Sequence, residues 1–202
     1  RVWFLEKTDT VCGMCARGCN TTASINPSTQ NLYRVEPRRN PEVNKSWMCD
    51  VGRWNFHYVY AEDRLKTPLK KISGEWLEMT WHQGFGELKV QFSHPEKVLI
   101  GLGTSLTNEE IADCVQTLGM LGATQFTWVV DEAVVEDRKP YDGILKHRDL
   151  TSNAMGFEKV MKSLGVEWMK QGAAEKRLKA GEYTRLLLLG LEGHVIPGLE
   201  GL

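Results

Sequence analysis

The chain has 202 residues, of which 42% are hydrophobic and 25% are charged, as expected of an ordinary globular protein with one large domain or two small ones. The formal net charge of −1 at pH 7 gives it no overall attraction to nucleic acid, so a nucleic-acid partner is not expected. No run of 18 apolar residues occurs, which excludes a sequence-predicted membrane span and direct membrane insertion.

Charge and cysteine are both unevenly distributed along the chain. Residues 1–70 contain eleven Lys and Arg residues against seven Asp and Glu, whereas residues 71–202 contain fourteen against nineteen. Four of the five cysteines also lie in the basic part. The asymmetry is either a chance distribution of solvated charges or a way to offset a negative site built from thiolates. An odd number of clustered cysteines fits a reducing compartment better than a disulfide framework.

The first 70 residues predict little regular structure. Residues 11–20 hold three Cys and two Gly, which is typical of a compact loop. Residues 20–25 and 32–36 are short β-prone runs separated by Asn, Pro and Ser, so a β-hairpin is expected there. A helix is then predicted from Asp50, as a possible N-cap, to Ala61.

The remaining residues alternate between strand and helix patterns. A tight turn is expected at Ser73-Gly74, and the next helix should begin after Thr80 and end near Phe92. Further strands are predicted over residues 97–102, 125–130 and 185–190, and further helices over residues 107–121 and 154–164. Because a helix connects the first two of these strands, they are expected to lie parallel in one sheet.

The sequence therefore predicts an α/β fold with two parts. Residues 1–70 would form a small, irregular, cysteine-rich domain with a β-hairpin. Residues 71–202 would form a parallel-sheet region, which is expected to be incomplete because no helix pattern follows its last strand.

The motif with the clearest chemistry is Cys12-x2-Cys15-x3-Cys19, followed after 29 residues by Cys49. Three closely spaced thiolates can surround one side of a small inorganic core, and a distant fourth can complete the set. Thiolates are the soft ligands that iron–sulfur clusters require, and a 4Fe-4S cluster takes four of them. The two glycines between these cysteines would allow the loop to turn tightly.

Other uses of these cysteines remain open at this point. A zinc-stapled structural module that binds partners would also need four ligands, although zinc sites usually consist of two similar short pairs. Cys49 has no Cys or His within four residues, and His57 lies farther along. Disulfides are disfavoured by the crowding of the thiols. The fifth cysteine, Cys114, falls inside a predicted helix among apolar residues and is expected to be a buried structural thiol rather than a ligand.

Residues 11–20 and 47–53 resemble the 4Fe-4S domain at the start of molybdopterin oxidoreductases. More narrowly, the chain is similar to the large iron–sulfur subunit of bacterial NADH:quinone oxidoreductase (respiratory complex I). Residues 40–44 (Asn-Pro-Glu-Val-Asn) and residues 62–69 carry this narrower match. The resemblance is specific over about residues 3–70 and looser in the α/β region.

The resemblance implies an electron-transfer subunit, or a fragment of one, in an NADH-oxidising respiratory complex. It implies one 4Fe-4S cluster held by Cys12, Cys15, Cys19 and Cys49. The implied partners are the other subunits of the complex, including one that binds NADH and flavin, and the implied location is cytoplasmic and peripheral to the inner membrane. The chain would belong to an enzyme without supplying a catalytic acid, base or nucleophile of its own.

The alternative within the same family is the cluster-bearing part of a molybdopterin oxidoreductase such as a formate dehydrogenase. In those enzymes a Lys typically stands two residues after the fourth cysteine and links cluster and pterin, whereas Val51 occupies that position here. Molybdopterin is therefore not expected. Trp47 and Trp54 flank Cys49 in sequence, and two explanations are open for them: shielding of the site from water, or ordinary core packing.

Overall fold

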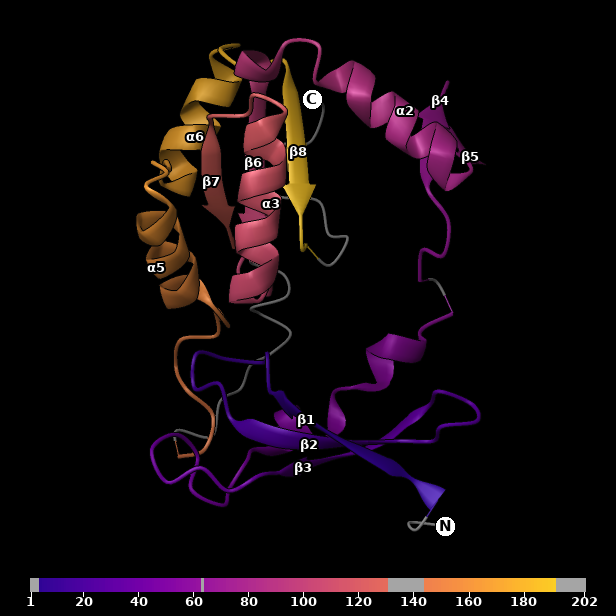
Figure 1. Cartoon of the computed structure of the whole chain (residues 1–202), viewed down its shortest axis with the longest axis vertical. Coiled ribbons are helices and arrows are strands. Elements are labelled where there is room, and N and C mark those ends of the chain that lie inside the picture. Colours follow the sequence, from indigo (N-terminus) through magenta and orange to yellow (C-terminus); the bar gives the residue numbers. More distant parts are fainter. Residues whose placement is uncertain (1–3, 63, 131–143, 192–202) are drawn as a thin grey trace.

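The computed structural model describes residues 4–62, 64–130 and 144–191. Within these ranges, no helix has the length and apolar character needed to span a membrane. The chain begins with an antiparallel sheet and continues into a parallel sheet flanked by helices (Figure 1). This arrangement confirms the predicted mixed α/β class.

The first sheet contains three strands in the order β1-β2-β3. Its strands are β1 (Glu6–Val11), β2 (Asn20–Ile25) and β3 (Leu32–Pro37). The predicted hairpin is β2–β3, and its turn is closed by the Asn26 side chain, which accepts a hydrogen bond from the Ser28 N–H at 2.9 Å. Strand β1 was not predicted from the sequence, because all six of its side chains are exposed and give no alternating pattern.

The helix predicted from Asp50 to Ala61 is wrong in both its cap and its length. Helix α1 (Asp50–Trp54) has Cys49 as its N-cap and ends after five residues. A separate 3-10 turn (His57–Tyr60) follows. Neither element buries a residue, and a short helix without a buried apolar face gains too little from packing to continue.

A peripheral hairpin and helix come next. Strands β4 (Leu69–Ile72) and β5 (Glu75–Glu78) are joined by Ser73 and Gly74, both at positive φ, as the predicted tight turn requires. Helix α2 (Trp81–Gln91) begins at the predicted Thr80 cap, which forms a capping box with Gln83. Helix α2 buries none of its own residues.

The second sheet is parallel, as predicted, with the strand order β7-β6-β8. Its strands are β6 (Val98–Gly103), β7 (Phe126–Val129) and β8 (Arg185–Leu189). The central strand β6 is buried along its whole length, which explains its continuous apolar sequence. The predicted strands at residues 97–102, 125–130 and 185–190 therefore correspond to this sheet.

Helices cover both faces of the parallel sheet (Figure 1). Helices α3 (Asn108–Met120) and α5 (Ala154–Leu164) pack on the face that carries Ile100 and form the larger core. Helix α6 (Gln171–Lys179) packs on the opposite face against Leu99. The sequence predicted α3 and α5 but not α6, because α6 buries only two of its nine residues.

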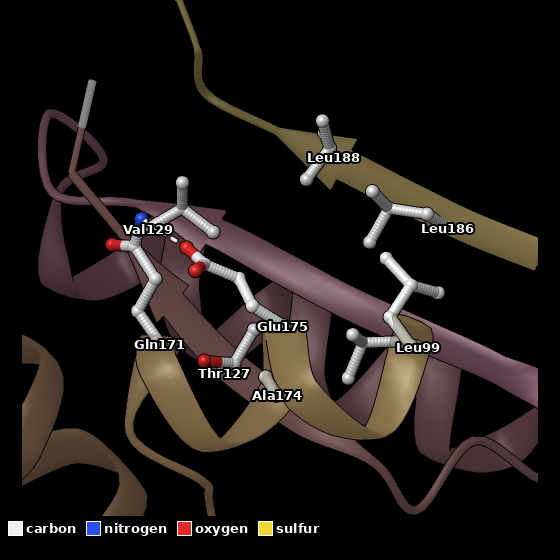
Figure 2. Close-up of a pocket in the computed structure, with 9 residues that line it drawn as sticks. Leu99, Thr127, Val129, Gln171, Ala174, Glu175, Leu186 and Leu188 are labelled. Atoms are coloured by element: carbon white, nitrogen blue, oxygen red, sulfur yellow. Dashed lines mark hydrogen bonds between the residues drawn. The ribbon is translucent and has the colours of Figure 1, made fainter. Parts of the chain in front are cut away.

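Helix α6 covers its face of the sheet only in part. A largely apolar pocket remains between the helix and the sheet, and Leu99, Leu186 and Leu188 line its sheet side (Figure 2). On the helix side, the Gln171 Nε2 donates to the Glu175 Oε1 at 3.0 Å. All five residues of β8 are accordingly only partly buried.

The two capping boxes allow a matched test of which helix belongs to the main core. Thr107→Ala should lower the free energy of unfolding by about 1 kcal/mol, because its hydroxyl accepts from the Glu110 N–H at 3.2 Å at the start of a helix with three buried residues. Thr80→Ala removes the same kind of cap from α2, where the hydroxyl accepts from the Gln83 N–H at 3.3 Å. This variant should leave the main urea-unfolding transition nearly unchanged. Circular dichroism measures the transition in both variants. Equal losses in the two variants would contradict this assignment.

Candidate metal centre

The loop of residues 12–19 connects β1 to β2 and carries three of the predicted ligands. Its ends are joined by the Cys12 N–H, which donates to the Cys19 carbonyl at 2.8 Å. Inside the loop, Gly18 adopts a φ of 61° and its N–H donates to the Cys15 carbonyl at 3.3 Å. This left-handed conformation favours glycine, so the motif folds as the compact turn that its composition predicted.

The fourth cysteine lies against this loop. Cys49 caps α1, and Gly52 lies in the first turn of that helix. A Cβ added at Gly52 would be 2.9 Å from the Cys12 Sγ and 3.9 Å from the Cys49 Sγ. The first of these distances is too short for a real Cβ, so a side chain at residue 52 would displace the Cys12 thiol. The structure thus brings the distant fourth thiol beside the first.

A buried asparagine joins the two cysteine segments. Asn44 is 5% exposed, and its Oδ1 accepts from the N–H of Asn20, the residue after Cys19, at 3.1 Å. Its Nδ2 donates to the carbonyl of Trp47, two residues before Cys49, at 3.0 Å. One side chain therefore holds the third and fourth cysteines in register through hydrogen bonds to their neighbouring backbone.

The other three thiols are close enough to affect the ionisation of Cys19. The pKa of Cys19 is raised from 9.0 to about 11, first by burial and then by the neighbouring Cys12, Cys15 and Cys49. Arg17 acts in the opposite direction on the pKa of the same thiol. Four thiolates are therefore unfavourable here without a positively charged core to hold them, which is what the iron of a 4Fe-4S cluster supplies. The donor set fits that cofactor.

The α/β region also contacts the cysteine loop. The Ala16 N–H donates to the Asp149 carbonyl at 3.0 Å, and the Ser152 hydroxyl donates to the Gly13 carbonyl. These partners belong to the segment of residues 144–153 that leads into α5. Sequence reasoning missed this segment, because hydrogen bonds to backbone carbonyls more than a hundred residues away leave no local pattern.

Core packing, one of the two explanations offered for Trp47 and Trp54, is wrong, because these side chains are 66% and 60% exposed. The adjacent Met48 is buried instead, and its Cε lies 3.1 Å from the position of a Cβ on Gly52. Phe56, also buried, is the aromatic residue of this segment that packs inward.

The remaining cysteine lies away from this group. Cys114 is on α3, where it packs against the main hydrophobic core, and burial raises its pKa. The predicted buried structural thiol is therefore only partly buried, although it does pack against the core. All five cysteines are present as thiols.

The geometry also bears on the zinc alternative. Among the residues that the structure describes, no three His, Cys, Asp or Glu side chains are grouped so that they could hold a metal ion. A zinc ion would need four ligand atoms about 2.3 Å from one centre. A 4Fe-4S cluster places its own iron and sulfide atoms between the thiolates, so its four ligands lie farther apart than those of a zinc ion.

Comparison with known proteins matches this site to a described family. Residues 5–57, which contain all four grouped cysteines, match the family model "NADH-ubiquinone oxidoreductase NDSU1/NuoG-like, 4Fe-4S domain". This part of the chain is therefore similar to the NuoG-like 4Fe-4S domain. The matched residues include the antiparallel sheet, the cysteine loop and α1.

Proteins similar to this chain are named as subunits of redox enzymes. The chain is 38% identical over 112 residues to NADH-quinone oxidoreductase subunit 3 of Thermus thermophilus, covering 54% of the chain and 14% of that protein. It is 28% identical over 112 residues to the G subunit of the Escherichia coli NADH-quinone oxidoreductase, covering 54% of the chain and 12% of that protein. It is 31% identical over 108 residues to the F420-dependent formate dehydrogenase 1 subunit alpha of Methanococcus maripaludis, covering 52% of the chain and 16% of that protein. The chain thus matches only a small part of each relative.

A solved structure shows a similar fold. Acetylene hydratase from Pelobacter acetylenicus superposes with a TM-score of 0.51 at 17% sequence identity, covering 61% of this chain and 18% of that one. At this identity the similarity concerns the fold alone.

Asn44→Ala should loosen the link between the two cysteine segments. The variant leaves the Asn20 N–H without its 3.1 Å acceptor, at an expected cost of about 1–3 kcal/mol. Hydrogen–deuterium exchange should rise in residues 12–20 and 44–52. Asn26→Ala, which removes a side-chain bond from an exposed turn, serves as the control. Unchanged exchange in both cysteine segments would show that Asn44 does not join them.

The raised pKa of Cys19 predicts its reactivity in cluster-free protein. Because the thiolate is the nucleophile, alkylation of Cys19 by iodoacetamide should keep accelerating up to about pH 11. Between the unfolded value of 9.0 and this folded value, the native state retains a proton that the unfolded chain has lost, so stability should fall as pH rises. Mass spectrometry of the alkylated peptides measures the rate, and a plateau near pH 9 would contradict the prediction.

Proposed function

We propose that Cys12, Cys15, Cys19 and Cys49 hold one 4Fe-4S cluster and that the chain transfers single electrons through it. The observation that carries this proposal is the grouping of four mutually interacting thiols, of which Cys15, Cys19 and Cys49 are at most 7% exposed. The match of residues 5–57 to a 4Fe-4S domain model supports it.

The chain and the cofactor have separate tasks in this proposal. When bound, the cluster supplies one-electron redox chemistry. The chain supplies the thiolates and excludes water by burying the site. Backbone N–H groups of the cysteine loop and the neighbouring Arg17 set the electrostatic environment, which influences the reduction potential. No step requires a catalytic acid, base or nucleophile from the chain.

We place this activity in a multisubunit NADH:quinone oxidoreductase. The relatives named as subunits of such enzymes support this assignment, although the chain spans only 12–14% of their length. In that setting the partners are other subunits of the complex, including one that binds NADH and flavin. The location is the cytoplasmic side of the inner membrane, peripheral to it.

Two structural units serve this function. Residues 1–70 form the cluster-binding domain, and residues 71–202 form an α/β region that supports it. The hydrogen bonds from the Ala16 N–H to the Asp149 carbonyl and from the Ser152 hydroxyl to the Gly13 carbonyl join the two units at the cysteine loop.

A second candidate is the cluster-bearing part of a molybdopterin oxidoreductase such as a formate dehydrogenase. The Methanococcus maripaludis relative and the fold of acetylene hydratase favour this candidate. Against it, Val51 can neither donate a hydrogen bond from its side chain nor carry a charge between a cluster and a pterin. Molybdenum in the purified full-length protein would decide for it.

Replacement of single cysteines tests the proposed ligands. Cys49→Ser should abolish or strongly reduce the bound iron and sulfide after anaerobic reconstitution, because one of four thiolates is lost. The broad visible absorbance that bleaches on reduction with dithionite should disappear with them. Cys114→Ser, which changes the thiol in the α3 core instead, should keep both.

An assay of iron, sulfide, zinc and molybdenum on the unsubstituted protein completes this test. Four iron and four sulfide per chain are expected for one 4Fe-4S cluster. One zinc per chain without iron would overturn the proposal and leave a structural module. Equal iron in the Cys49 and Cys114 variants would overturn the ligand assignment.

A further inference from the structure

Arg17 is a cation built into the cysteine loop, between Cys15 and Cys19. Its side chain is half-buried, and its Nη2 donates to the Ile144 carbonyl at 3.1 Å. Its Nε is buried and has no hydrogen-bond partner among the described residues. Burying a hydrogen-bond donor without an acceptor costs free energy. The Arg17 Nε therefore needs an acceptor that the described protein atoms do not supply.

A cluster in this loop would bring such acceptors. Thiolate and sulfide sulfurs accept hydrogen bonds, and these bonds are among the interactions that tune iron–sulfur potentials. The guanidinium is protonated at every accessible pH, so its charge is constant. Arg17 lies within the loop between Cys15 and Cys19, whereas the two charged residues of α1, Asp50 and Arg53, follow Cys49 on a separate element.

We infer that Arg17 is a positioning residue that raises the reduction potential of the 4Fe-4S cluster by holding a fixed positive charge beside it. The inference rests on the proposed cluster. Reduction adds one electron and therefore one negative charge to the cluster and its thiolates, and a nearby cation stabilises that extra charge. Removing the cation makes the same electron harder to add.

The position of this charge depends on the second half of the chain. The Ile144 carbonyl holds the guanidinium, and the Asp149 carbonyl holds the backbone of the preceding residue, Ala16, at 3.0 Å. Lysine has the same charge but only one nitrogen, so it cannot present both an N–H to Ile144 and a second donor at the position of Nε.

The test uses the whole chain, residues 1–202, loaded with cluster anaerobically and titrated with dithionite as the one-electron donor. Electron paramagnetic resonance measures the midpoint potential. Arg17→Gln should shift the one-electron reduction equilibrium about tenfold toward the oxidised cluster, which corresponds to about 59 mV, with iron and sulfide content unchanged. Arg17→Lys should shift it less. Arg39→Gln removes the same charge at an exposed position and should leave the potential unchanged.

The outcomes separate this inference from the proposed function. If the loaded Arg17→Gln protein has the unsubstituted potential, or if Arg39→Gln shifts the potential equally, the inference is wrong and the cluster remains. If the unsubstituted chain binds no iron, the proposed function itself fails. Arg17→Met provides a second neutral variant that keeps the aliphatic stem. If neither neutral variant binds a cluster while Arg17→Lys does, the charge serves assembly and not the potential, which also overturns the inference.

Discussion

The first part of this structure has to hold four sulfur atoms close together, although neighbouring thiolates repel one another. Burial and three nearby thiols raise the pKa of Cys19 to about 11, so the isolated protein favours the neutral thiol at this residue. A charged iron core reverses this preference, because its positive charge offsets the thiolates. The fold therefore has to bring the four sulfurs together before any favourable interaction between them exists.

Backbone hydrogen bonds, rather than apolar packing, meet this requirement. The Cys12 and Cys19 backbones close the loop at 2.8 Å, and Asn44 links Asn20 to the Trp47 carbonyl. The parallel sheet is built differently, since β6 is fully buried and helices pack on both of its faces. The two parts thus depend on different interactions: specific polar contacts at the metal centre and hydrophobic burial in the α/β region.

The same difference explains how far the sequence could predict the structure. Elements with local signals were predicted well: Thr80 and Thr107 begin their helices in capping boxes, and Gly165 ends α5 at a φ of 66°. Elements without such signals were missed or mistaken, including the exposed strand β1, the polar helix α6 and the short helix α1. At the site, cysteine spacing was sufficient to group the four thiols. The contacts from residues 144–153 depend on tertiary structure and could not be predicted from the sequence.

The contacts between the cysteine loop and the segment before α5 can form only after all four cysteines of the site have been synthesised. During synthesis, Cys49 leaves the ribosome about a hundred residues before Asp149. Throughout that interval the nascent chain has all four thiols but lacks the carbonyls that hold Ala16 and Arg17. A cluster delivered early would enter a loop open to solvent and oxygen, whereas one delivered later would enter a loop already braced by the α/β region. The timing of iron delivery relative to translation therefore determines which of these two environments the metal first meets.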